Sequence, residues 1–338
     1  MGQTWDGGDV SFKKETWEYC FSVLKEGGYL LSFGGSRTYH RIACAIEDAG
    51  FEIRDCILWL YGTGFPKSMN VAKGMESKEH FGKAGTRQKR QIEQESEGEG
   101  YTINQTKNGC IGKTEPTIRK VYLPITELGK KWEGYGTCLK PAYEPILIAR
   151  KPFKGSLIDN LFKNGVGAIN IDACKIGKDE GRFLTNVILD DSVEVVRSFP
   201  TPALARYFYS AKISHKDREE GLDQLESKDK EEARFQPVQR KNTHPTVKPT
   251  ELMQYLIRMF CPKGSNILDP FMGSGSTGKA YMFENREREA KYFFIGIEMT
   301  EEYLPIAKER ILYAKNKYQY YKDETSVVKT LFDYMEDE

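Results

Sequence analysis

The chain has 338 residues, a hydrophobic fraction of 39%, a charged fraction of 29% and a formal net charge of +1 at pH 7. This composition supplies a sizeable core, excludes a wholly disordered or fibrous chain, and contains no run of about 18 uncharged apolar residues that would span a membrane. The seven cysteines are scattered without a C-x-x-C pair, which favours reduced thiols in the cytoplasm over disulfides or a structural metal. The balanced charge neither requires nor excludes nucleic acid, because phosphate binding depends on a local basic groove.

The first sixty residues have the pattern of an α/β fold. Apolar residues at helical spacing alternate with short apolar runs, and glycines separate the segments. The expected elements are a helix over 11–26, a strand over 29–33, a helix over 37–49 and a strand over 53–61.

Two polar stretches interrupt this pattern. Residues 74–120 are rich in Gly, Gln and Glu and predict a loop-rich insertion. Order is expected to return near Trp132, with a strand over 145–149. Residues 212–242 are dense in Lys, Asp, Glu and Arg and predict a charged linker.

The last block returns to the α/β pattern. We expect a helix capped by Thr250, a strand over 266–268, a helix over 276–284, a strand over 292–297 and a helix over 301–315.

A glycine-rich turn lies between the first strand and the second helix of this block. Gly273, Gly275 and Gly278 let the backbone approach a ligand closely, and the helix N-terminus presents free N–H groups. Glu298, 20 residues after Gly278, can accept hydrogen bonds from ribose hydroxyls. This spacing alone suggests a dinucleotide site or a tight turn without a ligand, but the remaining chain is too short for both dinucleotide-binding halves.

Three motifs carry a family resemblance. They are His-Pro-Thr-Val-Lys-Pro over 244–249, Asp-Pro-Phe-Met-Gly-Ser-Gly over 269–275, and Phe-Ile-Gly-Ile-Glu over 294–298, followed by Tyr303, Ala307 and Arg310. In this order they resemble the S-adenosylmethionine-dependent DNA amino-methyltransferases of the beta class, and in detail those of phages and prophages. The resemblance implies S-adenosylmethionine as the cofactor, in place of a nicotinamide dinucleotide.

The resemblance also implies the architecture. The expected fold is a circularly permuted, Rossmann-like α/β fold, with a mostly parallel twisted sheet flanked by helices. Its expected segments are a catalytic half over 1–73, a target-recognition-like insertion over 74–135, the end of the catalytic half and a connection over 136–211, a polar charged linker over 212–242, a cofactor-binding half over 243–320 and a tail over 321–338.

Site residues follow from the same motifs. The cofactor is expected beside Asp269, Phe271, Gly273, Gly275, Thr277, Glu298, Thr246 and Lys248. The target base and DNA are expected beside Arg37, His40, Phe65 and Lys67, and DNA phosphates beside Arg87, Lys89 and Arg90. Several alternatives stay open: Phe271 and Phe65 as core residues, Thr277 as a helix start, and the charged side chains as solvated surface.

One family motif is absent from the sequence. The catalytic tetrapeptide, Asp-Pro-Pro-Tyr or a close variant, is expected about ten residues before a Trp-Asp pair such as Trp5-Asp6, and no Pro-Pro pair occurs anywhere. We therefore assign no catalytic residue. Because the tetrapeptide ends a central strand in this family, the sheet is expected to lack one strand. A truncated product or a misplaced start is the expectation, and a partner that supplies the strand is the alternative.

The implied reaction is methyl transfer from S-adenosylmethionine to an exocyclic amino group of a flipped base in double-stranded DNA. Adenine N6 is preferred over cytosine N4. The alternatives are a remnant that binds cofactor or DNA without methylating, and an RNA amino-methyltransferase. A cognate restriction nuclease is the further partner expected, and no metal is expected.

Overall fold

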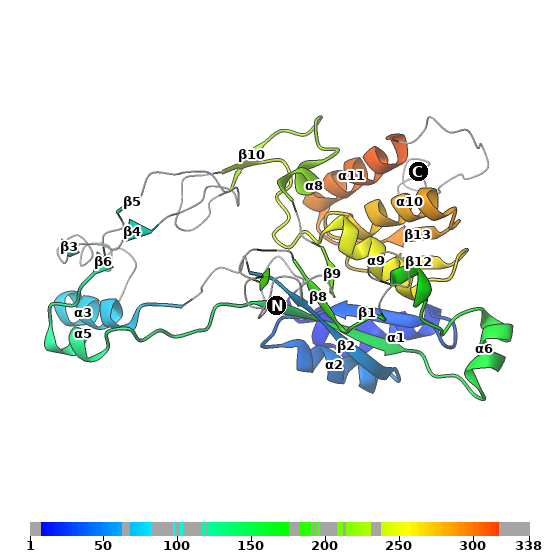
Figure 1. The fold of residues 1–338 in the computed structure, drawn as a ribbon, viewed down its shortest axis with the longest axis horizontal. Coiled ribbons are helices and arrows are strands. Elements are labelled where there is room, and N and C mark those ends of the chain that lie inside the picture. The colour runs from blue at the N-terminus through cyan, green and yellow to red at the C-terminus, as the bar shows by residue number, and fades with distance from the viewer. Residues whose placement is uncertain are drawn as a thin grey trace. The chain divides into compact units, whose positions relative to one another are not determined.

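The computed structural model describes most of the chain in several ranges. These are residues 8–62, 68–82, 97–98, 102–103, 117–118, 121–175, 183–190, 192, 195–196, 208–211, 214–230 and 238–317. The chain divides into two units, Met1–Gly62 with Tyr143–Glu338, and Thr63–Ala142. The second unit contains the predicted insertion and extends beyond it at both ends (Figure 1).

The larger unit contains a five-stranded sheet. Its strands, in spatial order, are β1 (Tyr29–Phe33), β7 (Tyr143–Arg150), β2 (Glu52–Leu60), β8 (Val187–Leu189) and β9 (Tyr209–Ser210). β7 is antiparallel to both β1 and β2, whereas β2–β8 and β8–β9 are parallel. A mostly parallel sheet is expected, but two of the four strand pairings in this sheet are antiparallel, because β7 lies between β1 and β2.

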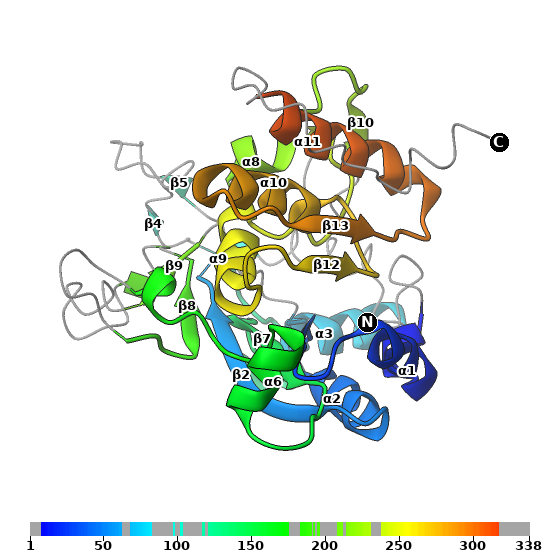
Figure 2. The same cartoon turned by 90° about the vertical axis from the view of Figure 1, so that its right-hand side faces the viewer.

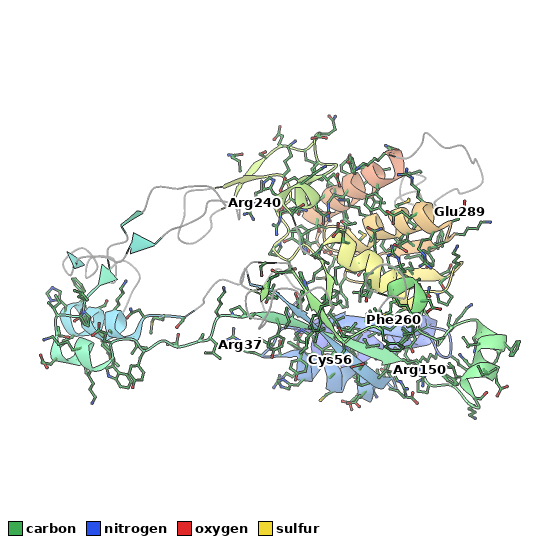
Figure 3. The ribbon with its side chains drawn as sticks, viewed as in Figure 1. Arg37, Cys56, Arg150, Arg240, Phe260 and Glu289 are labelled. Carbon is green, nitrogen blue, oxygen red and sulfur yellow. The ribbon has the colours of Figure 1, made fainter. Side chains whose placement is uncertain are left out.

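Helices cover both faces of this sheet. α1 (Lys14–Val23) and α2 (Tyr39–Asp48) bury residues such as Trp17 and Ile46 against Leu147 of β7. On the other face, α9 (Thr250–Phe260) buries Leu256 among residues of β2, β7 and β8. Phe260, labelled in Figure 3, packs on Tyr29 of β1 with ring centroids 4.9 Å apart.

A second, two-stranded parallel sheet carries the glycine turn. β12 (Asn266–Asp269) pairs with β13 (Phe293–Gly296). α10 (Ser276–Arg288), the short 3-10 helix η5 (Glu301–Tyr303) and α11 (Leu304–Asn316) complete this part, and Ile267, Phe294 and Ile311 share its core. In both views β12 lies between β13 and the five-stranded sheet (Figures 1 and 2). The mixed α/β architecture predicted from the sequence is confirmed.

In these two sheets, the outer edges of β1, β9, β12 and β13 have no partner among the residues that the structure describes. β1 pairs only with β7, and β12 pairs only with β13. Within those residues, the sheet therefore exists as two separate pieces.

Local differences from the predicted elements have local causes. The expected helix over 11–26 is η1 (Val10–Phe12) followed by α1, because the extended backbone of Lys13 separates them. Thr250 is the first residue of α9 and not its cap; its hydroxyl donates to the Asp217 carboxylate. α10 continues to Arg288, one turn beyond the predicted end.

The segment predicted as a charged linker is structured where it is described. It forms α8 (His215–Glu219) and the antiparallel pair β10 (Lys228–Lys230) and β11 (Val238–Arg240), and it buries Leu222 fully. α6 (Leu157–Asn164) and η3 (Asp172–Cys174) lie in the connection after β7.

The smaller unit is built around two helices, α3 (Val71–Phe81) and α5 (Glu127–Lys131), with the two-residue strands β3 (Glu97–Gly98), β4 (Thr102–Ile103), β5 (Thr117–Ile118) and β6 (Val121–Tyr122). The buried Glu76 carboxylate accepts the N–H groups of Ile125 and Thr126, both at 2.7 Å. Because these amides precede α5, a negative charge on α3 stabilises the start of α5.

Candidate functional site

The glycine turn follows the carboxyl end of β12. Gly273 (φ +54°) and Gly275 (φ +73°) both have left-handed backbones, which glycine adopts without strain. A Cβ at Gly273 would lie 2.6 Å from Nε2 of His244, and one at Gly275 would lie 2.9 Å from Cα of Ala307. Protein groups therefore approach both glycines closely, and the predicted close approach of a ligand stays a prediction.

Glu298 joins this turn to the end of β13. One carboxylate oxygen accepts the N–H of Gly273 at 2.7 Å, and the other accepts the N–H of Thr300 at 2.7 Å. The backbone adds two bonds between the same segments, from Met272 to Ile297 and from Ile297 to Asp269, each 2.9 Å long. Carboxylate oxygens have further lone pairs, so Glu298 can still accept ribose hydroxyls from its fixed position.

Asp269 lies at the start of the turn. Its carboxylate accepts the Thr277 hydroxyl and, at 3.1 Å, the N–H of Phe271. Burial raises the pKa of Asp269, the nearby Glu298 charge adds to that rise, and the two hydrogen bonds partly offset it. Thr277 thus orients Asp269 from the start of α10, and contact between Thr277 and the cofactor stays a prediction.

Phe271 does not fill the core. Its side chain is 48% exposed, and its inner side meets the buried Trp17 of α1, with ring centroids 6.0 Å apart. A large aromatic side chain held in this way offers an apolar surface to a ligand.

The motif over 244–249 contributes three differently placed side chains. Thr246 is exposed, and its N–H donates to Nδ1 of His244 at 3.3 Å. Lys248 is half-buried: its Nζ lies 2.6 Å from a Glu144 carboxylate oxygen and 4.7 Å from the Phe33 ring centroid. Lys248 is therefore not a solvated surface lysine; it joins this motif to β7 and to the end of β1.

Sequence reasoning missed two neighbours of the site. His244 lies against Gly273 and packs edge-on against Tyr303 at 4.6 Å, and its place inside the motif was the available signal. Glu144 faces Lys248 from 104 positions away, and nothing in the local sequence indicates that pairing.

The predicted DNA-facing residues are only partly described. Arg37, labelled in Figure 3, and His40 are exposed beside the end of β1. Phe65, Lys67, Arg87, Lys89 and Arg90 lie outside the described residues. Within the described part of the chain, no helix is long and apolar enough to cross a membrane, and no group of three or more His, Cys, Asp or Glu could hold a metal ion.

The solved structures that match this chain include DNA methyltransferases. One titled as the M1.HpyAVI complex with SAM is 16% identical and covers 88% of this chain and 81% of that one, with a TM-score of 0.41. The PvuII DNA methyltransferase (cytosine-N4-specific) is 12% identical and covers 93% of this chain and 73% of its own, with a TM-score of 0.41.

Curated relatives match at two scales. The type II methyltransferase M.HindIII of Haemophilus influenzae is 24% identical over 314 residues, which cover 91% of this chain and 71% of that protein. The type II methyltransferase M2.DpnII of Streptococcus pneumoniae is 43% identical over 68 residues, which cover 20% of this chain and 23% of that protein. A family model described as DNA methylase, for N6 and N4 methyltransferases, matches residues 8–309. This match spans most of the chain and confirms the resemblance to DNA amino-methyltransferases, so the chain belongs to the DNA methylase family of N6/N4 amino-methyltransferases.

Proposed function

We propose that the glycine turn binds S-adenosylmethionine and that the protein serves methyl transfer to an exocyclic amino group in DNA. The observation that carries this proposal is the joint placement of Glu298, Asp269 and the exposed Phe271 ring around one left-handed turn. Membership of the DNA methylase family supplies the reaction class.

Each residue has a distinct task in this proposal. Glu298 accepts the ribose hydroxyls, Phe271 packs on the cofactor, and Asp269 binds near its methionine amino group. Thr246 and Lys248 lie toward the carboxylate end. The bound cofactor supplies an electrophilic methyl group on a sulfonium sulfur, and the leaving group is a neutral thioether. Positioning of the two reactants therefore provides most of the acceleration.

The direct test is calorimetric titration of the full chain with S-adenosylmethionine. We expect one site per chain, with competition by S-adenosylhomocysteine. Absence of binding by a folded chain would contradict the proposed function.

The acceptor side of the reaction needs groups that the sequence lacks. In this family the tetrapeptide accepts hydrogen bonds from the target amino group and stacks on the flipped base. We propose that a strand carrying this tetrapeptide completes the site, and the edges of β1 and β12 that have no described partner support this proposal.

Labelled methyl incorporation into DNA tests the proposed strand. Turnover per cofactor-binding site should rise by orders of magnitude when roughly 15–30 residues containing Asp-Pro-Pro-Tyr precede the chain. Equal turnover with and without them would show that the acceptor groups lie within these 338 residues. We propose adenine N6 as the acceptor, and N4-methylcytosine in the digested product would contradict that choice.

We further propose that the unit Thr63–Ala142 selects the DNA target. It begins shortly after the last residue of β2 (Leu60) and stops directly before the first residue of β7 (Tyr143), so exchanging the whole unit leaves both strands intact. Replacement by the corresponding unit of a relative should change which sites are protected from restriction and leave cofactor affinity unchanged. A fixed target with altered cofactor affinity would contradict this assignment.

A further inference from the structure

The short helix α8 connects several elements of the cofactor half. The Asp217 carboxylate accepts the N–H of Thr250 at 2.8 Å and the Lys279 ammonium at 2.8 Å. The Asp217 carbonyl accepts a guanidinium N–H of Arg310 at 3.2 Å. Glu220, directly after α8, also pairs with Lys279 at 2.8 Å. We call Asp217, Glu220, Lys279 and Arg310 the ion group.

The two cations of the ion group are almost completely buried. Lys279 is 1% exposed and Arg310 is 0% exposed. Buried charges need close partners, because burial of an unpaired charge is costly. Burial works against ionisation of Asp217, but the charge and hydrogen bond of Lys279 and the bonds from Thr250 lower its pKa below the ordinary value. Lys279 is thus held by an ionised carboxylate, and a guanidinium nitrogen of Arg310 lies 3.7 Å from the same carboxylate.

Arg310 also reaches the glycine turn. Its Nη1 donates to the Ser274 carbonyl at 2.7 Å, to the Ser274 hydroxyl at 3.0 Å and to the Ser276 hydroxyl at 3.1 Å. Ser274 stands between the two left-handed glycines, and Glu298 holds the N–H of Gly273. The turn is therefore fixed by a carboxylate and by a buried guanidinium.

We infer that Arg310 is a positioning residue for cofactor binding, and that α8 acts on the cofactor site through it. Arg310 fixes the carbonyl of Ser274 and so the orientation of the turn that carries the Gly273 amide. Asp217 in turn fixes the second nitrogen of the guanidinium. This inference rests on the proposed S-adenosylmethionine site. It gives residues 214–220, which lie in the segment predicted as a polar charged linker over 212–242, an effect on ligand binding.

Lys279 provides a matched control for Arg310. It shares Asp217 and the same degree of burial. Among the described residues, its ammonium bonds to Asp217 and Glu220 and to no group of the turn. If the ion group only stabilised the fold, loss of Lys279 and loss of Arg310 would have the same effect on cofactor affinity. A positioning role makes only Arg310 matter for affinity once the protein is folded.

The experiment compares Arg310→Met, Arg310→Lys and Lys279→Met in the full chain. Denaturant unfolding measures stability, and calorimetry measures the dissociation constant for S-adenosylmethionine per folded molecule. Both Met variants should lose stability. Arg310→Met should weaken affinity at least about tenfold, Arg310→Lys by less, and Lys279→Met by less than about twofold. Equal affinity in Arg310→Met and the parent, or equal weakening in Lys279→Met, would overturn the inference.

Ser274→Ala keeps the test decisive if Arg310→Met does not fold. This change removes one acceptor of Arg310 and leaves the ion group intact, and we expect affinity to fall about threefold. Unchanged affinity in Ser274→Ala together with unchanged affinity in Arg310→Lys would overturn the inference. A folded parent that does not bind S-adenosylmethionine would instead contradict the proposed function itself.

Discussion

The carboxylate of Glu298 accepts the amide N–H of Gly273 at 2.7 Å, across 25 positions of sequence. The side chain predicted to bind a ribose therefore also closes the turn that would hold the rest of the cofactor. Loss of Glu298 should affect the shape of the site and its contacts with the ligand together.

Glu298→Gln tests this double role. The amide keeps one acceptor oxygen but presents its NH2 to a backbone N–H that also donates, so one hydrogen bond is lost. We expect a loss of about 1 kcal/mol in the free energy of unfolding and at least a tenfold weaker affinity for S-adenosylmethionine. Glu301→Gln, at an exposed carboxylate three positions away, is the control and should change neither quantity. Unchanged affinity in Glu298→Gln would remove Glu298 from the cofactor site.

Gly275→Ala should disturb packing more than Gly273→Ala. A Cβ at Gly275 meets the backbone of Ala307 at 2.9 Å, whereas a Cβ at Gly273 meets the imidazole of His244 at 2.6 Å, and a side chain can turn away. Both substitutions carry about 1 kcal/mol of left-handed backbone strain. Thermal unfolding should therefore show a clearly larger decrease for Gly275→Ala. An equal decrease for both would mean that α11 yields as easily as a side chain.

Asp269→Asn should separate stability from binding. Burial raises the pKa of the Asp269 carboxyl in the folded state, so its protonated form is favoured by folding. The stability that comes from the protonated Asp269 is complete at pH values below the pKa of Asp269 in the unfolded chain. It is lost as the pH rises through the pKa of Asp269 in the folded protein. Asparagine carries no charge, so the variant should exceed the parent in stability by about 1 kcal/mol at pH 7 and lose this advantage near pH 3.

Urea unfolding at several pH values checks this profile, and calorimetry at pH 7 should show weaker cofactor binding. A stability difference that does not change with pH would show that the Asp269 charge is not the cause.

Substitution of phenylalanine for two buried tyrosines should change the free energy of unfolding differently. The Tyr281 hydroxyl is buried and has no hydrogen-bond partner within the part of the chain that the structure describes, while its ring stacks on Phe294 at 5.0 Å. The Tyr292 hydroxyl donates to the carbonyl of Cys261 at 2.7 Å. Tyr281→Phe should leave stability unchanged or raise it by about 1 kcal/mol, and Tyr292→Phe should lower it by about 1 kcal/mol. Losses of equal size in denaturant unfolding would show that Tyr281 has a partner in solution.

The site was predictable where its signals are local. β12, the glycine turn and α10 follow one another directly, so apolar runs and glycines locate them within a few residues. The exposure of Phe271 was not predictable, because it depends on how Trp17 packs beneath it. Asp269 and Thr277 lie within one segment, and their contact follows from helix and turn geometry.

Long-range partners explain what the sequence left out. Asp217 pairs with Lys279 across 62 positions, so a stretch predicted as a charged linker supplies the carboxylate that a buried lysine needs. The antiparallel entry of β7 between β1 and β2 is likewise set by pairing partners, and a strand's apolar pattern does not name its neighbours. The apolar periodicity of a segment indicates which of its faces is buried. Only the folded structure shows which residues pack against that face.

β2 ends and β7 begins at facing residues, since Leu60 pairs with Tyr143. The chain thus leaves the sheet and re-enters it at two paired residues, like a hairpin whose loop is the unit Thr63–Ala142. Lengthening such an excursion costs only about 0.6 kcal/mol of closure entropy for each doubling in length. The connection between β2 and β7 therefore tolerates exchange or enlargement of the inserted unit during evolution, while the register of the sheet stays fixed.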